Sequence, residues 1–175
     1  MKHTLLLGII SLWTFAASAQ TYVDLGLPSG TKWKTVNETN PKDKYNFFTY
    51  KEALVKFGDQ LPTYEQLVEL QDNCTWTWDT IKKGCTGVGP NGESIFLPAA
   101  GVRENGTVYL LDNYAEYWSR TPWETDNNYF WGLRFWLQSY NGEPMLMMNG
   151  LPRINGLSVR LVNNDGNTDK NAKKK

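Results

Sequence analysis

Apolar residues recur at helical spacing in two segments near the start of the chain. In segment 49–57 (TYKEALVKF) they lie three and four positions apart behind a threonine, and Gly58 follows as a natural helix end. Segment 63–70 (TYEQLVEL) begins directly after a proline and carries a glutamine three residues behind its threonine, which is the pattern of a capping box. Both segments are therefore predicted to be helices.

After Cys74 the apolar pattern changes to short runs with a period of two. Such runs, rich in aromatic and β-branched residues, are typical of strands, and Asn-Gly pairs between them are typical of tight turns. Helices followed by strands indicate an α+β domain. Strands are expected at 75–81, 94–97, 108–111, 116–119, 129–137, 145–148 and 157–162, and Asn-Gly turns at 91–92, 105–106, 141–142, 149–150 and 155–156.

Segment 129–137 (YFWGLRFWL) is the most informative of these strands. Because alternate residues lie on opposite sides of a strand, its core side is expected to hold Trp131, Leu133, Phe135 and Leu137. The other side mixes rings with a guanidinium and an amide, and tryptophan and arginine are enriched where proteins bind partners. Either this side is a ligand-binding surface, or its two aromatic rings pack beneath the following loop. Its members are Phe130, Gly132, Arg134, Trp136 and Gln138.

The two ends of the chain differ from the part between them. Lys2 precedes an apolar run at 5–15 and the small residues of 17–19 (ASA), a pattern that indicates a cleaved secretory signal. We expect a signal peptide at 1–19, one domain at 20–164 and a disordered, lysine-rich tail at 165–175. The product is expected to be secreted, periplasmic or at the cell surface, with no membrane insertion after signal cleavage.

The composition then limits the kinds of catalysis and binding that the chain can perform. The chain has 18 basic and 18 acidic side chains, two cysteines and one histidine. That histidine is His3, so the mature chain is expected to contain none, which excludes histidine-dependent nucleophiles, histidine-ligated zinc and histidine general bases. The balanced charge argues against nucleic acid as a partner, because binding phosphates requires a basic face.

The two cysteines are Cys74 and Cys85. Export would place them in an oxidising compartment, where closing this short loop would add about 2–4 kcal/mol of stability. We therefore expect a disulfide between them rather than two free thiols. A catalytic thiol has less support because no histidine can activate it, although Lys82 or Lys83 could lower its pKa.

Acidic residues are scattered singly along the chain. No spacing among them selects the two facing carboxylates that a glycosidase needs. Loop 124–128 (ETDNN) is rich in oxygen ligands but lacks the spacing of a defined calcium loop. We therefore predict no catalytic residue, no metal site and no cofactor.

Six motifs are spread over the chain: 22–33 (YVDLGLPSGTKW), 61–63 (LPT), 72–78 (DNCTWTW), 91–101 (NGESIFLPAAG), 117–119 (YWS) and 158–160 (SVR). Together they resemble the Fibrobacter succinogenes major paralogous domain family, a family of secreted domains common in gut Bacteroidetes. The resemblance implies a C-type lectin-like fold within the α+β class. In that fold two helices flank a small, twisted, mostly antiparallel sheet with long loops, and the chain ends meet, here near Tyr22 and Val162.

The same resemblance implies that a long loop region and the last strands present the binding surface. Relatives that oxidise a substrate cysteine use a cysteine pair near the C-terminus, and no cysteine follows Cys85 here. Calcium-dependent sugar-binding lectins use Glu-Pro-Asn or Gln-Pro-Asp, and 143–145 (EPM) lacks the third ligand. The resemblance therefore supports neither cysteine oxidation nor calcium-mediated sugar binding.

These observations predict a non-catalytic binding module, secreted or on the cell surface, that recognises a glycan or a protein ligand. Rings could stack on a sugar and guanidinium groups could hold a carboxylate, whereas the methionine-rich run 145–148 suits an adaptable protein contact. A carboxylate-dependent carbohydrate-active enzyme and a structural component of a surface assembly remain the alternatives. The residues expected to contact the ligand are Trp123, Arg134, Trp136, Tyr140 and Arg153.

Overall fold

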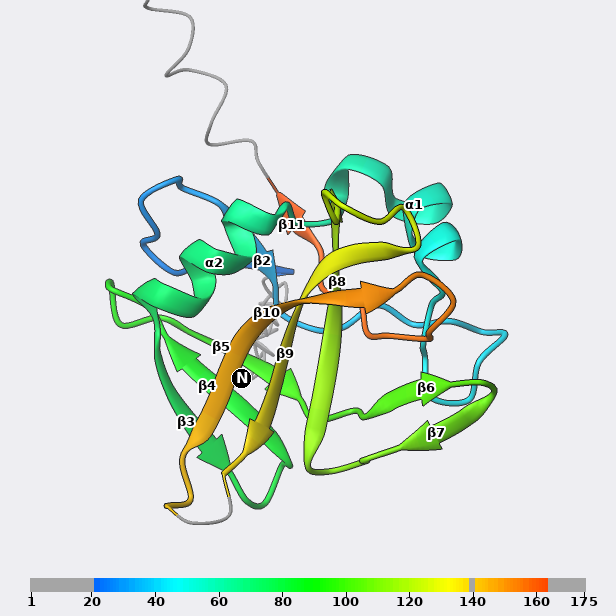
Figure 1. Cartoon of the computed structure of the whole chain (residues 1–175). Helices are drawn as coiled ribbons and strands as arrows, with labels where there is room; N and C mark the ends of the chain where they lie inside the picture. Colours follow the sequence, from blue (N-terminus) through cyan, green and yellow to red (C-terminus); the bar gives the residue numbers. More distant parts are fainter. Residues whose placement is uncertain (1–20, 139–140, 164–175) are drawn as a thin grey trace, which may run out of the picture.

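The structure, a computed structural model, describes residues 21–138 and 141–163. The expected signal peptide (1–19), the expected tail (165–175) and Tyr140 lie outside these residues, as do both ends of the expected domain. The described chain is an α+β domain with short helices and several small antiparallel sheets (Figure 1).

Both predicted helices are confirmed. Thr49 closes a capping box with Glu52, and Thr63 closes one with Gln66, which satisfies the first free N–H groups of each helix. The second helix runs three residues beyond its expected end, and the backbone becomes extended only at Cys74. No helix within 21–138 or 141–163 is long and apolar enough to cross a membrane. The helical elements are α1 (Tyr50–Phe57), the 3-10 turn η1 (Gly58–Gln60) and α2 (Tyr64–Asn73).

The strands form three three-stranded sheets and one hairpin, and every pairing between named strands is antiparallel. The first sheet is β1 (Tyr22–Asp24), β2 (Lys32–Lys34) and β11 (Val162–Asn163), in the order β1-β2-β11. The second sheet is β3 (Thr75–Asp79), β4 (Gly84–Val88) and β5 (Ser94–Pro98). The third sheet is β8 (Tyr114–Pro122), β9 (Tyr129–Leu137) and β10 (Pro144–Pro152), and the hairpin is β6 (Val102–Glu104) with β7 (Thr107–Tyr109).

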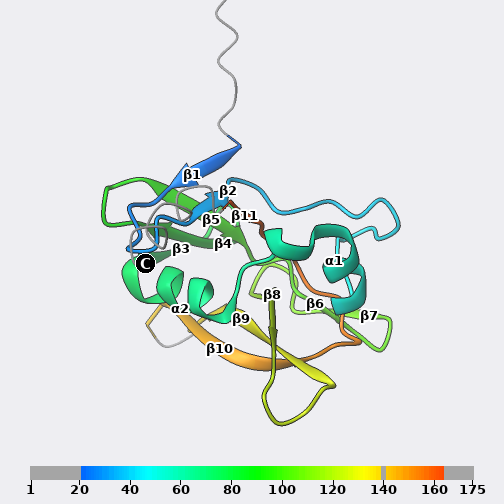
Figure 2. The same cartoon turned by 90° about the horizontal axis from the view of Figure 1, so that it is seen from above.

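The third sheet organises the molecule. Figures 1 and 2 show α2 beside β10 and α1 beside one end of β8, in agreement with their contacts. The β6–β7 hairpin emerges next to the beginning of β8, where Gly101 bridges to Ala115. The two ends of the described chain meet, as expected, because Val162 pairs with Trp33 on the strand beside β1.

The structure corrects the expected strands at several places. Asn149-Gly150 is not a turn but part of β10, where Gly150 lies opposite Trp131 and a Cβ would overlap the indole of Trp123. The expected strand 157–162 is reduced to isolated bridges and to β11, because successive residues there pair with different segments. Four strands were not expected: β1, β2, β4 and β6. They are only three residues long or, in β4 (GCTGV), lack alternating apolar residues.

Two buried clusters cover different parts of the third sheet. Leu133 and Phe135, on the predicted core side of β9, belong to a large cluster with Trp33 and residues of α2 and the second sheet. On the opposite side, Trp118 and Leu151 pack with α1 in a second cluster. The first cluster therefore covers one face of the sheet, whereas the second covers the opposite face toward the Phe130 end.

The expected Cys74–Cys85 disulfide is not formed, and both cysteines are free and buried. The strand register explains why: Cys85 pairs with Trp78, four residues along the chain from Cys74, which corresponds to about 13 Å of strand. A disulfide needs Cα atoms within about 7 Å. Burial raises the pKa of the Cys74 thiol to about 11 and that of Cys85 to about 12, so neither is activated as a nucleophile.

Candidate functional site

The register of the third sheet brings six side chains together on its less covered face. Residues directly opposite each other in antiparallel strands share a face and lie close together. Here each of two rows crosses all three strands. The rows are Tyr114, Trp136 and Met145, and Glu116, Arg134 and Met147. We name these six residues the β8–β10 patch.

The same face is closed at its other end. There Phe130 stacks on Tyr50 of α1, and Tyr50 also meets the edge of Trp118 with ring centroids 5.5 Å apart. Leu151 completes the covered part. The predicted ligand side of β9 is therefore divided: Phe130 is packed, but against α1 rather than beneath the following loop, whereas Trp136 lines an open hollow.

This hollow, the Trp136 hollow, has a volume of about 420 Å³, within the range of small-ligand sites. A neighbouring hollow of about 350 Å³ shares Leu110 and Tyr114 with it. The first is lined by Leu110, Asn113, Tyr114, Arg134, Trp136 and Leu137, and the second by Val102, Glu104, Tyr109, Leu110 and Tyr114.

Glu116 lies beneath this surface and is only 5 % exposed. Its Oε1 accepts a hydrogen bond from the Tyr114 hydroxyl. Burial raises the pKa of Glu116, the hydrogen bond from Tyr114 lowers it, the negative charge of Glu104 raises it, and the positive charge of Arg134 lowers it. Burial, followed by the charge of Glu116, raises the pKa of Tyr114. The carboxyl group is thus held in a site that favours its neutral form.

Two polar atoms at this place are buried without a hydrogen-bond partner among residues 21–138 and 141–163: Oε2 of Glu116 and Nε of Arg134. Buried polar atoms without partners are rare and costly. The Arg134 guanidinium lies 5.8 Å from the centroid of the Trp136 ring, and its Nη2 lies 3.5 Å from the sulfur of Met147. The rings of Tyr114 and Trp136 are stacked, with their centroids 6.5 Å apart. The donor (Arg134), the acceptor (Glu116) and the ring (Trp136) therefore have defined positions relative to one another.

The rim of the Trp136 hollow has a strained backbone. Leu110 has φ +57° and Asp112 has φ +65°, a left-handed conformation that bulky residues rarely adopt. Their backbone is held by hydrogen bonds, from Asp112 N to Ala99 O and from Asn113 N to Leu110 O.

The other predicted ligand residues lie elsewhere. Trp123 packs on Trp131 with ring centroids 4.1 Å apart, and the register places Trp131 on the opposite face of the sheet from the patch. Arg153 is exposed in the turn after β10, where its carbonyl accepts a hydrogen bond from Tyr50 N, at the end of the sheet remote from Trp136. Of the predicted ligand residues, the structure brings Arg134 and Trp136 together, and Tyr140 lies outside the described residues.

Tyr114, Glu116 and Glu104 were not predicted to belong to a site. A sequence signal exists for the first two, because residues two positions apart on a strand share a face, but the expected strand began only at residue 116. Pairing with β9 could not be read from the sequence. Glu104 approaches through the β6–β7 hairpin, and its carboxylate lies 3.4 Å from Nδ2 of Asn155.

The described residues contain no group of three or more His, Cys, Asp or Glu side chains arranged to hold a metal ion. In the oxygen-rich loop 124–128, Oδ1 of Asp126 accepts a hydrogen bond from Asn128 N and so shapes a turn. Comparison with known proteins finds no matching family model, no matching curated protein and no matching solved structure. Any function must therefore be inferred from the chemistry of the described residues.

Proposed function

We propose that the chain is a non-catalytic domain, secreted or at the cell surface, that binds a carbohydrate at the β8–β10 patch. The observation that carries this proposal is the pair of partnerless buried atoms, Oε2 of Glu116 and Nε of Arg134, beside the ring of Trp136. Side chains cover both atoms, so a ligand that displaced this cover and paired with them would remove the cost of leaving them unpaired. Oε2 would accept a hydrogen bond from the ligand when the carboxyl group is ionised and donate one when it is protonated.

A sugar matches these groups because each hydroxyl is both a donor and an acceptor. Its apolar ring face can lie against an indole, and Trp136 lines the hollow. Asn113, also on the rim, adds an amide that donates and accepts. A hollow of about 420 Å³ accommodates a small ligand or the end of a chain rather than a long extended segment.

A protein ligand is the second candidate, favoured by the two methionines of the patch. Met145 is 40 % exposed and Met147 is 36 % exposed, both on the outer strand of the sheet. Methionine adapts to irregular apolar surfaces and is common at promiscuous protein contacts. A peptide would use these thioethers, whereas a sugar would use mainly Trp136, Arg134 and Glu116.

The resemblance to the Fibrobacter succinogenes major paralogous domain family supports the same location. It implies a C-type lectin-like version of the α+β fold, with the binding surface on a long loop region and the last strands. The patch lies on β8, β9 and β10, in the C-terminal half of the chain. We include this fold, this family and export from the cell in the proposal.

The rival from another class is a carboxylate-dependent carbohydrate-active enzyme. One observation favours such an enzyme: two acids interact here, because the negative charge of Glu104 raises the pKa of Glu116. In such an enzyme a buried carboxyl group with a raised pKa would act as the general acid. The role of Glu116 then distinguishes the two functions, because a binding domain would leave the saccharide intact.

The test is a glycan array followed by calorimetry with the best-binding saccharide. Trp136→Ala should lower affinity at least tenfold, whereas Trp123→Ala, a tryptophan change on the opposite face of the same sheet, should leave it within twofold. Chromatography of the saccharide after long incubation should show no cleavage. Equal losses in both variants, absence of any glycan binding, or cleavage abolished by Glu116→Gln would each overturn the proposal.

A further inference from the structure

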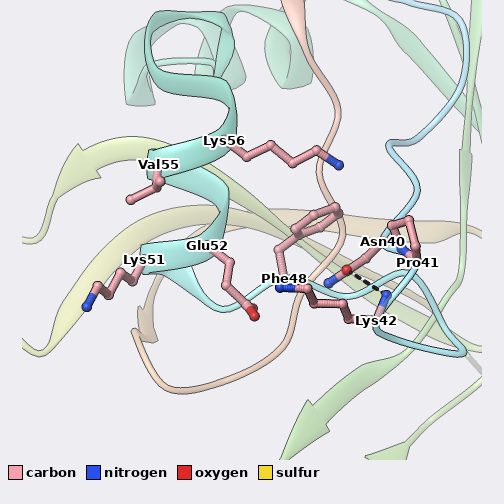
Figure 3. A pocket seen from close by; sticks show the side chains of 8 residues that line it. All are labelled: Asn40, Pro41, Lys42, Phe48, Lys51, Glu52, Val55 and Lys56. Atoms are coloured by element: carbon pink, nitrogen blue, oxygen red, sulfur yellow. Dashed lines mark hydrogen bonds between the residues drawn. The ribbon is translucent and has the colours of Figure 1, made fainter.

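A third hollow, the α1 hollow, lies on the outer side of α1, away from the β8–β10 patch. Tyr50, Ala53 and Phe57 turn the inner side of this helix to the core, so its other side is left facing the segment 40–48. The space between them has a volume of about 440 Å³ (Figure 3). It is lined by Asn40, Pro41, Lys42, Phe48, Lys51, Glu52, Val55 and Lys56.

The charge around the α1 hollow is opposite to that of the domain. The described residues contain 13 basic and 16 acidic side chains, yet the lining includes Lys42, Lys51 and Lys56, and none of the three forms an ion pair within the described part of the chain. Glu52 is the one acid in the lining, and its carboxylate already accepts hydrogen bonds from N and Oγ1 of Thr49 at 2.8 and 2.9 Å. With three ammonium groups against one carboxylate, the lining carries an excess of two positive charges.

The wall of the hollow is held in place before any ligand arrives. Nζ of Lys56 donates to Thr39 O at 3.2 Å and lies 5.1 Å from the centroid of the Phe48 ring. Oδ1 of Asn40 accepts a hydrogen bond from Lys42 N. Figure 3 shows Lys56 extending over one side of Phe48 and Lys42 passing on the other, with Lys51 at the outer rim. Such preorganisation reduces the entropy cost of binding.

Between the ammonium groups the walls are apolar. They consist of Pro41, Phe48, Val55 and the methylene stems of the lysines, which cover apolar surface while their charged ends remain in water. Few polar atoms are therefore available to a sugar hydroxyl. An anion that also carries an apolar body would satisfy both the charge and the walls.

We propose that the α1 hollow binds a small organic carboxylate with an aromatic or aliphatic body. The apolar body lies against Pro41, Val55 and the lysine stems, above the nearly buried ring of Phe48, and the carboxylate lies between the ammonium groups. This site is independent of the carbohydrate proposal, since the two hollows share no lining residue. If binding at one hollow is disproved, binding at the other can still be tested.

Phenylacetate is the probe, and phenylacetamide is its neutral counterpart of nearly the same shape. Titration followed by two-dimensional amide NMR should show saturable shifts in α1 and in segment 40–48 with the acid, and at least tenfold weaker binding of the amide. Affinity should fall as salt is added, because ion pairing at an exposed site is screened. Equal binding of acid and amide, or shifts confined to the β8–β10 patch, would overturn the assignment.

Lysine variants locate the charge. Lys51→Gln, which removes a side chain at the rim, should weaken phenylacetate binding about threefold, and the combined Lys51→Gln and Lys56→Gln variant about tenfold, as expected for partly exposed ion pairs. Lys44→Gln is the matched control, since Lys44 lies in the same segment but over the ring of Tyr45 and not in the lining. Thermal unfolding of each variant checks that it folds. An equal loss in Lys44→Gln would contradict the proposal.

Discussion

At one end of the β8–β9–β10 face, Trp118, Phe130 and Leu151 are covered by α1, and at the other end Tyr114, Arg134 and Trp136 border a hollow. Both ends have the same strand alternation, and each places an aromatic ring of β9 on this face. The difference comes from a helix that precedes the sheet in the chain. An aromatic residue on a strand thus contributes to stability or to binding according to what the rest of the chain places over it.

The largest expected effect is a difference in the free energy of unfolding between substitutions at the two ends. Trp118 is fully buried and its indole N–H donates to Phe48 O at 2.8 Å, so Trp118→Ala should cost about 3–5 kcal/mol of unfolding free energy. Trp136→Ala, at the open end, should cost about 1 kcal/mol. Urea unfolding of the two variants measures both. Similar costs would show that the open end is packed as tightly as the covered one.

A smaller effect is expected at the boundary between the two ends. A Cβ at Gly132 would lie 2.6 Å from Tyr117 O and would also overlap the side chain of Leu151. Gly132→Ala should therefore cost about 1–3 kcal/mol in the same measurement, because the strands would have to move apart. Met145→Ala, on the exposed strand of the patch, should change stability by about 0.5 kcal/mol or less. A neutral Gly132→Ala would show that the strands at this point are loosely packed.

The third effect depends on pH and tests the buried acid of the open end. Burial raises the pKa of Glu116 above its ordinary value of 4.5, so the folded state binds its proton more tightly than the unfolded chain does. Ionisation therefore reduces stability as pH rises through the interval between the unfolded and the folded pKa. Glu116→Gln removes this cost, so its unfolding temperature relative to wild type should rise by roughly 3 °C between pH 4 and pH 7.5.

Glu124→Gln, at an exposed position, serves as the control for that experiment. Its difference from wild type should be the same at both pH values. A Glu116→Gln difference that is also constant with pH would show that folding does not shift the pKa of Glu116, and one that falls as pH rises would show that folding lowers it. Either result would contradict the raised pKa that burial gives this carboxyl group.

Local patterns predicted some parts of this structure well. The two capping boxes are complete within a few residues, so both helix starts were correct. Strand β9 was predicted over its full length because seven of its nine residues are aromatic residues or leucine. The α+β class follows from the order of these elements. In each case the decisive interactions lie close together in the sequence.

Features that depend on pairing between distant segments of the chain were not predicted. The patch requires the register of β8 against β9, which joins Glu116 to Arg134 across many residues. The disulfide was wrong for a similar reason, because the register of β3 and β4 separates the two cysteines. Asn149-Gly150 has the composition of a turn but serves as a place where the Trp123 ring can approach the backbone.

The open end of the third sheet is the proposed ligand-binding surface. NMR tests it directly when the indole N–H of Trp136 and the side-chain N–H groups of Arg134 are followed during titration with the saccharide that binds best. These resonances should shift in proportion to saturation, while the indole N–H resonances of Trp118 and Trp123 stay in place. Shifts at Trp118 or Trp123, with Trp136 and Arg134 unchanged, would contradict this proposal.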